Sequence, residues 1–276
     1  MTRVSPLPDE VHLIERARAG DEAALTLLVE TYAPRVLRFA QKLCGPSSAS
    51  ADAEDVLQQT LVSVISHIDE FRGDSQFASW LYAIARSHCI KQRTRGAAAH
   101  PTQPLADAEP AIPTSPQQAP DENISREQLQ DALNVAIDAL EPAQREVLVL
   151  RDIEGLGAPD VAQALGISVD AVKSRLHRAR KTLRERLTPW FEQSEQSAAC
   201  PDVVDLLSRY QEGDITSEVC QAMQAHVDGC PQCAKRCHSL RTVLSACSAT
   251  PVPVLSPEMK QAVQEQVRRS LRRQRG

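Results

Sequence analysis

The sequence predicts an all-α protein with two small helical domains, a proline-rich linker between them and a small helical domain rich in Cys and His. Aromatic residues make up only 3% of the 276 residues, which argues against a large sheet core. Apolar residues recur at spacings of three and four, as on one face of a helix. Six of the eight cysteines follow residue 199. The expected domains are 1–95, 123–190 and 196–250, with a linker at 96–122 and a basic amphipathic tail at 251–276.

Four helices are expected in the first domain, over residues 9–19, 21–43, 52–69 and 76–95. Asp21 is suited to cap the second helix. The third carries an apolar stripe at spacings of 4, 3 and 4: Leu57, Leu61, Val64 and Ile68. This periodicity predicts a small helical bundle.

The linker contains six prolines between residues 101 and 120, among Ala, Thr, Gln and Ser. Such a segment does not form a packed core and is semi-extended. Helical periodicity resumes at Ile124, and Pro142 is placed to open a new helix.

Residues 155–187 predict a helix-turn-helix. Gly166 supplies the turn, and Ser168 is suited to cap a second helix that begins at Val169. One face of that helix is apolar: Val172, Leu176, Ala179 and Leu183. The roughly opposite arc carries Lys173, Ser174, His177, Arg178 and Lys181.

A solvated basic face is the ordinary alternative for such a helix. Residues 173–186 carry seven Lys or Arg and a single acid, Glu185, which favours contact with a DNA major groove. The whole chain has a net charge of −5, so the basic charge is local. We therefore expect binding to DNA at chosen points, with a partner supplying the remaining affinity.

The N-terminus lacks the apolar core of a signal peptide, and no long uncharged apolar segment is present. We expect a soluble, cytoplasmic chain. In a reducing compartment, eight cysteines point to metal or redox chemistry rather than a disulfide framework. Cys44 and Cys89 are expected to be core residues.

A metal site is predicted in the cysteine-rich segment. His226 and Cys230 are one helical turn apart, and Cys230 and Cys233 flank a turn that Gly229 and Pro231 favour. This spacing suits three ligands of a tetrahedral zinc ion, with Cys200 as the expected fourth. The alternative is a set of reduced, buried cysteines. Further thiols and one imidazole are candidates for additional metal binding or redox chemistry: Cys220, Cys237, His238 and Cys247.

Three segments together resemble the extracytoplasmic-function sigma factors of the sigma-70 family: DAEDVLQQT at 52–60, FRGDSQFASWLYAIAR at 71–86, and the helix-turn-helix segment at 141–183. The resemblance covers most of residues 9–190. It implies that the chain is not an enzyme, and that it directs core RNA polymerase to promoters through contacts with the β′ clamp helices and the β flap. A separate anti-sigma partner is not required.

The resemblance also implies roles for individual residues. The residues expected to dock on the polymerase are Asp52, Asp55, Gln58 and Gln59. Reading and opening of the −10 element falls to Phe71, Arg72, Asp74, Trp80, Arg86, Lys91 and Arg93. Reading of the −35 element falls to Lys173, Ser174, Arg175, His177, Arg178 and Lys181. For Trp80, Phe71 and Phe77, simple core packing is the alternative.

Residues 200–244 resemble the zinc-binding anti-sigma domain, and its fusion to a sigma factor resembles the CorE-like metal-responsive sigma factors. That resemblance implies a tail that senses a metal, with zinc at the four-ligand site and Cu, Cd or Zn as the sensed ion. Sensing of thiol oxidation and a purely structural zinc stay open as alternatives. A stand-alone metal-responsive DNA-binding regulator and a metal-buffering protein are the rival functions.

Overall fold

The structure is a computed structural model that describes residues 7, 9–44, 50–73, 75–99, 122–191 and 199–275. Within these residues the secondary structure is helical and contains no strand, which confirms the all-α prediction. The chain divides into two compact units. Asp74 and the prolines of the linker lie outside the described residues, as do the side chains of Arg273 and Arg275.

The first unit combines residues 1–105, 154–166 and 251–276. Its helices are α1 (Glu10–Arg18), α2 (Glu22–Leu43), α3 (Ser50–His67), the 3-10 turn η1 (Ile68–Glu70), α4 (Phe77–Ala99), α7 (Ala158–Leu165) and α12 (Pro257–Arg275). Asp21 caps α2 as predicted, because its carboxylate accepts the amide hydrogens of Ala23 and Ala24. The predicted stripe of α3 and η1 is buried throughout.

A buried polar cluster joins three segments of the first unit. Glu154, which precedes α7, is 1% exposed. Its carboxylate accepts two hydrogen bonds from Arg38 of α2, each 2.8 Å long, and one of 2.7 Å from the Tyr82 hydroxyl of α4. Burial raises the pKa of Tyr82, and the neighbouring Glu154 carboxylate raises it further. The hydroxyl therefore stays protonated and keeps donating to Glu154.

Cys44, which follows α2, and Cys89 of α4 form a disulfide in the first unit. Their Cα atoms are 5.3 Å apart, within the normal range for such a bond. Cys89 is a core residue as expected, at 3% exposure, whereas Cys44 is half-buried, and their pairing in a disulfide was not predicted. Because the two cysteines lie 45 positions apart in the chain, no local sequence pattern reveals the pairing.

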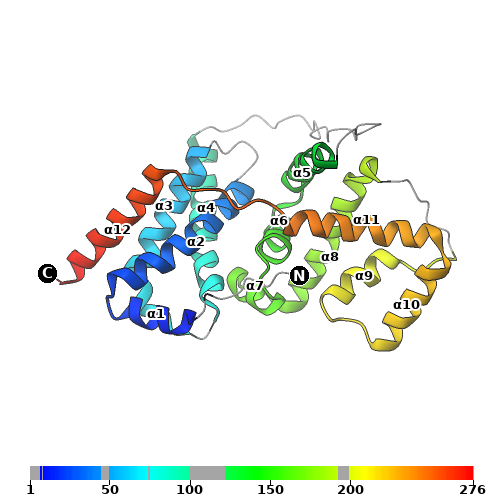
Figure 1. Cartoon of the computed structure of the whole chain (residues 1–276), viewed down its shortest axis with the longest axis horizontal. Coiled ribbons are helices and arrows are strands. Elements are labelled where there is room, and N and C mark those ends of the chain that lie inside the picture. Colours follow the sequence, from blue (N-terminus) through cyan, green and yellow to red (C-terminus); the bar gives the residue numbers. More distant parts are fainter. Residues whose placement is uncertain are drawn as a thin grey trace. The chain divides into compact units, whose positions relative to one another are not determined.

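The C-terminal helix α12 packs on α2 and α3 of the first unit (Figure 1). The apolar side of this amphipathic helix is buried: Val263, Val267 and Leu271. Gln264 donates a 2.8 Å hydrogen bond to Glu30, and Arg268 lies 3.3 Å from Glu22. The basic tail therefore lies on an acidic, apolar face of α2 in its own chain.

The second unit combines residues 106–153 and 167–250. Its helices are α5 (Glu122–Asp138), α6 (Pro142–Leu148), the π-helical turn η2 (Val149–Ile153), α8 (Val169–Arg186), the 3-10 turn η3 (Thr188–Trp190), α9 (Val203–Gln211), α10 (Ser217–Gly229) and α11 (Pro231–Ser248). Pro142 opens α6 as predicted.

The predicted helix-turn-helix segment has the expected local features. Gly166 ends α7 with a left-handed backbone, φ +66°, which favours glycine. The Ser168 hydroxyl accepts the amide hydrogen of Ala171 and caps α8. The four residues of the predicted apolar face of α8 are each 0% exposed. That face is therefore committed to the core.

We call α9, α10 and α11 the C-terminal module. The module has a core of its own: Val203, Val204, Leu207, Met223, Val227, Cys233, Cys237 and Leu240. Two of its helices, α9 and α11, also pack on α8, and α11 contacts α5 and η2 as well. No described helix is long and apolar enough to cross a membrane.

Candidate functional site

The four predicted metal ligands lie together in the C-terminal module. The Sγ atoms of Cys200, Cys230 and Cys233 and a ring nitrogen of His226 are all within 4.8 Å of one another. Cys200 precedes α9, His226 is in the last turn of α10, and Cys230 and Cys233 lie at the start of α11. The site therefore joins the ends of three helices.

The distances suit a tetrahedral zinc ion. Cys200 Sγ and Cys230 Sγ are 3.9 Å apart, and His226 Nε2 lies 3.2 Å from Cys233 Sγ. Zinc–sulfur bonds of about 2.3 Å place two tetrahedral thiolates about 3.8 Å apart. Three thiolates and an imidazole are also a ligand set that zinc prefers. Bound there, the ion would supply a crosslink between the three helix ends.

The remaining candidate ligands lie apart from this site. Among the described residues, the four-ligand cluster is the one group of three or more such side chains that is close enough to share an ion. Cys237 and Cys247 are buried, Cys220 is half-buried and His238 is exposed. Burial raises the pKa of the Cys237 thiol, which makes it a poor nucleophile. The described residues therefore contain no second group of three or more such ligands.

The basic helix α8 presents two polar flanks. Ser174, Arg178 and Lys181 are exposed on one flank. On the other, Lys173 and His177 are half-buried and Arg180 is fully buried. The six residues predicted to read the −35 element are therefore divided: Lys173 and His177 face the C-terminal module, Arg175 is half-buried, and the remaining three are open to solvent.

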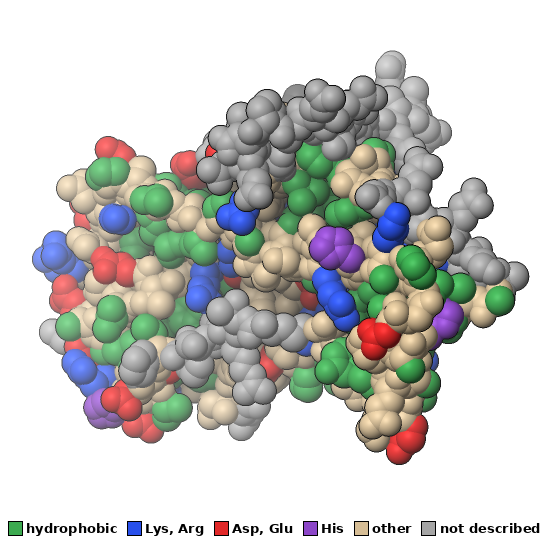
Figure 2. Space-filling model, turned by 45° about the vertical axis from the view of Figure 1, so that its right-hand side comes forward, with side chains coloured by type: hydrophobic (Ala, Val, Ile, Leu, Met, Phe, Trp, Pro, Cys, Tyr) green, Lys and Arg blue, Asp and Glu red, His purple; other side chains and the backbone are tan. Residues whose placement is uncertain are grey.

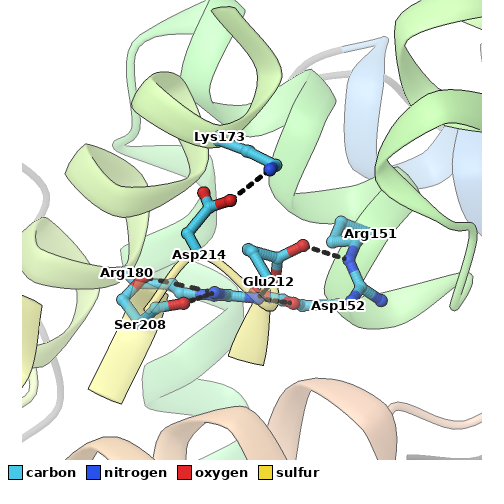
Figure 3. A network of polar contacts seen from close by, with 7 residues as sticks. All are labelled: Arg151, Asp152, Lys173, Arg180, Ser208, Glu212 and Asp214. Carbon is cyan, nitrogen blue, oxygen red and sulfur yellow. Dashed lines mark hydrogen bonds and ion pairs between the residues drawn. The ribbon is translucent and has the colours of Figure 1, made fainter. Parts of the chain in front are cut away.

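Acidic residues of the C-terminal module meet the second flank. Lys173 pairs with Asp214, which lies in the loop after α9. His177 Nδ1 is 3.4 Å from a carboxylate oxygen of Asp205 in α9, which makes an ion pair when the imidazole is protonated. Figure 3 shows Lys173 pointing toward Asp214, next to the network around Arg180.

Arg180 is the centre of a buried network at the same interface (Figure 3). It donates two hydrogen bonds to Asp152 of η2, at 2.9 and 2.7 Å, and one of 2.8 Å to Glu212 after α9. It also donates to the backbone oxygen and the hydroxyl of Ser208, at 3.2 Å each. The second oxygen of Glu212 accepts a 2.9 Å hydrogen bond from Arg151. The fully buried guanidinium of Arg180 therefore forms one ion pair with a carboxylate of η2 and another with a carboxylate of the C-terminal module.

The electrostatics of this network favour the charged form of Arg180. Burial alone would lower the pKa of its guanidinium, but the carboxylates of Asp152 and Glu212 outweigh that effect and raise it. Loss of either carboxylate would leave a buried charge only partly compensated. The interface therefore depends on both partners.

The aromatic residues of the segment 71–80 form a cluster in the first unit. The Phe71 and Phe77 rings are 5.5 Å apart, and Trp80 lies 5.5 Å from the first and 5.7 Å from the second. Phe71 and Phe77 are 6% and 2% exposed, so they pack in the core, whereas Trp80 is half-buried. Arg72, Lys91 and Arg93 are exposed, and Arg86 is half-buried. The open part of the predicted −10 surface is therefore mainly basic.

The predicted polymerase-docking residues lie on α3. Asp55 and Gln58 are exposed, while Asp52 and Gln59 are half-buried. Asp52 accepts a 3.1 Å hydrogen bond from Gln92 of α4. These side chains share the polar side of α3, opposite its buried stripe.

Sequence reasoning missed the residues that contact the covered flank of α8: Asp152 of η2, and Asp205, Ser208, Glu212 and Asp214 of the C-terminal module. Their spacing carries no recognisable motif. The available signal was the acidic character of the segment 202–214, which faces a helix with an excess of cations.

Comparisons with known proteins agree with this arrangement. The Sigma-70 region 2 family matches residues 28–98, and the Sigma-70, region 4 family matches residues 130–183. A zinc-finger family matches residues 200–234, which include all four clustered ligands. These matches cover the predicted −10, −35 and metal-binding segments in the expected order.

Several curated proteins are similar over about two thirds of the chain. The ECF RNA polymerase sigma factor SigE of Mycolicibacterium smegmatis is 33% identical over 184 residues, which are 65% of this chain and 68% of that protein. The ECF RNA polymerase sigma-E factor of Escherichia coli is 30% identical over 193 residues, which are 66% and 96% of the two chains. The RNA polymerase sigma-H factor of Pseudomonas aeruginosa is 29% identical over 182 residues, which are 64% and 93%.

These similarities, together with the order of the matched regions, identify the chain: it belongs to the extracytoplasmic-function sigma factors of the sigma-70 family, which are transcription initiation factors.

Proposed function

We propose that this sigma factor directs core RNA polymerase to specific promoters and that metal binding to its own C-terminal module controls this activity. In this proposal α8 reads the −35 element through the six side chains named above, and the exposed cations of α4 and the preceding loop contact the −10 element. Asp52, Asp55, Gln58 and Gln59 dock on the polymerase. The protein works with the polymerase in the cytoplasm.

A single observation carries the regulatory part of the proposal. The helices whose ends carry the four metal ligands are the ones that form the C-terminal module, and two of them, α9 and α11, pack on α8. A change in the metal site therefore acts on the element that is proposed to bind DNA.

Metal binding and folding are coupled in sites of this size. Cys200 lies before α9, and two other ligands of the same cluster, Cys230 and Cys233, lie at the start of α11. Without an ion, three thiols and an imidazole at one point no longer hold these ends together. We expect α9 then to loosen from α8.

Thiol oxidation is the second candidate for control, and it rests on the 3.9 Å distance between Cys200 Sγ and Cys230 Sγ. Hydrogen peroxide could take two electrons from these thiolates, which would form a disulfide and release the zinc ion. A metal that serves only to hold the module together is the third candidate.

Run-off transcription with purified core polymerase tests the proposal. The template carries the promoter of the protein's own gene, and the full chain is first stripped of metal and then titrated with Zn(II), Cd(II), Cu(II) or Cu(I) under matched redox conditions. We expect transcript yield to change with one of these ions. A separate arm with zinc-loaded protein and peroxide reports on oxidation.

Two variants sharpen this test. Cys230→Ser removes a clustered ligand and should abolish the metal response. Cys220→Ser, a half-buried thiol outside the cluster, is the matched control and should keep the response. Equal transcription in all metal states would overturn metal control. A response to peroxide alone would favour the oxidation candidate.

A further inference from the structure

The side of α8 that the C-terminal module covers is a regular stripe. Lys173, His177, Arg180 and Arg184 follow one another at spacings of 4, 3 and 4, so they share one flank of the helix. Each has a polar partner on the module: Asp214, Asp205, Glu212 with Ser208, and Ser239, respectively. We call these four side chains of α8 the cationic stripe.

The partners are mainly carboxylates. Asp205, Glu212 and Asp214, which we call the acidic face, lie within ten residues on α9 and the loop that follows it. Three carboxylates on one edge of the module thus face the cations Lys173 and Arg180 and the imidazole of His177 on one flank of α8. Carboxylates and DNA phosphates compete for the same Lys and Arg donors.

We propose that the acidic face occupies the cationic stripe in place of the phosphates of duplex DNA, so that the C-terminal module and duplex DNA exclude each other from α8. This inference rests on the proposed function, since it takes α8 as the helix that binds the duplex. Beyond the proposed function, the inference names duplex DNA as the ligand that competes with the C-terminal module, and it names the residues of α8 for which the two compete.

The contacts between the acidic face and the cationic stripe differ in burial, and we infer different roles for the buried pair and for the partly exposed pairs. Arg180 and Glu212 are almost fully buried, at 0% and 4% side-chain exposure, and they anchor the module. The pairs Lys173–Asp214 and His177–Asp205 are partly exposed, at 26% to 32%. Partly exposed pairs contribute little free energy each, so phosphates can replace them one at a time. The exposed Arg178 and Lys181 beside the stripe can make the first DNA contacts while the module is still in place.

The test measures binding of a fluorescein-labelled 25-base-pair duplex of random sequence to the full zinc-loaded chain by anisotropy at low salt. In the variant Asp205→Asn/Asp214→Asn the acidic face loses two charges and keeps its shape and the Arg180 anchor. We expect this variant to bind the duplex about three- to tenfold more tightly than the parent chain. The control Asp131→Asn/Glu218→Gln removes two exposed carboxylates from the same unit and should leave the affinity nearly unchanged.

A second measurement distinguishes competition from a general charge effect. Lys173→Gln should weaken DNA binding little in the parent chain, where Asp214 holds the lysine, and several-fold in the Asp205→Asn/Asp214→Asn background. Equal effects of Lys173→Gln in both backgrounds would overturn the proposal, as would equal gains from the acidic-face variant and its control.

This assay contains neither polymerase nor a metal titration. If transcription proves insensitive to metal but the acidic-face variant gains affinity, metal control fails and the competition stands. If the metal response is present and the affinity gain is absent, the competition fails and the proposed function stands. Circular dichroism on each variant confirms that the helical fold is retained.

Discussion

At the scale of single residues, Glu154 has the clearest expected effect on stability. Its carboxylate is buried and is the hydrogen-bond partner of Arg38 and Tyr82. Glu154→Gln would remove the carboxylate charge from its buried ion pair with the Arg38 guanidinium. We expect a loss of about 2–4 kcal/mol in the free energy of unfolding, measured by urea denaturation.

Glu70→Gln is the control for that variant, since Glu70 is an exposed acid of the same unit. Its effect should be under about 0.5 kcal/mol. If the two variants unfolded at the same urea concentration, the Glu154 cluster would not be a stabilising contact.

We expect His88 to make the stability of the first unit depend on pH. Burial lowers the pKa of His88, and the positive charge of Lys91 lowers it further. Between the depressed folded value and the ordinary value of 6.5, the unfolded chain binds more protons than the folded chain. Stability from this group is therefore complete above pH 6.5 and is lost as the pH falls below it.

His88→Asn should reduce the loss of stability below pH 6.5. The unfolding temperature at pH 7.5, 6.5 and 5.5 measures this dependence. His12→Asn is the control, because His12 is an exposed histidine of the same unit. We expect this variant to keep the pH dependence of the parent chain. A slope that persists in His88→Asn would assign the effect to another group.

Residue-level prediction from the sequence succeeded where a local pattern exists. The apolar face of α8 and the Ser168 cap depend on neighbours within a few positions. Glu154 and Arg180 depend on partners 116 and up to 32 positions away, so no window of sequence contains the reason for their burial. The same separation concealed the disulfide between Cys44 and Cys89.

At the scale of elements, α12 is expected to stabilise the first unit. Val267 is 0% exposed between α12 and its neighbours. Val267→Asp would place a carboxylate in that apolar contact, and we expect a loss of about 2–4 kcal/mol of unfolding free energy from this unit. Hydrogen exchange should show faster exchange in α12 and on the adjoining part of α2.

Arg269→Glu is the control on α12, because Arg269 is exposed and pairs with Glu265 one turn earlier in the same helix. Exchange in α2 should stay as in the parent chain. If α2 were as strongly protected from hydrogen exchange in Val267→Asp as in the parent chain, α12 would not contribute to the stability of the first unit.

Helix positions followed from periodicity, but their exact geometry did not. The prediction for the fourth helix ended at residue 95, whereas α4 continues to Ala99. The π-helical turn η2 has no sequence signature, although it places Arg151 and Asp152 in the network around Arg180. The aromatic residues of segment 71–80 fitted both base stacking and core packing, and tertiary contacts decided in favour of the core for two of them.

At the scale of the whole molecule, the four-ligand site predicts a defined stoichiometry. We expect one zinc ion per chain by native mass spectrometry of the purified protein, because the described residues contain one suitable cluster. Cys233→Ser should reduce the zinc content strongly. Cys247→Ser, a buried thiol outside the cluster, should keep one ion.

The order of functional segments was predictable from sequence, since each is a contiguous motif. The interaction of the C-terminal module with α8 was not, because it depends on how acidic and basic surfaces meet after folding. Metal-ligand spacing revealed the site, and only the structure revealed which helix the module covers.

The position of Arg180 in the chain also has a consequence during synthesis. Its second carboxylate, Glu212, lies 32 residues downstream, and Cys233, the last ligand of the cluster, is later still. At about 5–20 residues per second, a ribosome makes Glu212 roughly 2–6 s after Arg180. On the function proposed above, each newborn chain would therefore complete the helix proposed to read the promoter before the C-terminal module that competes with DNA for it, and we expect the supply of metal during translation to affect how soon that interval ends.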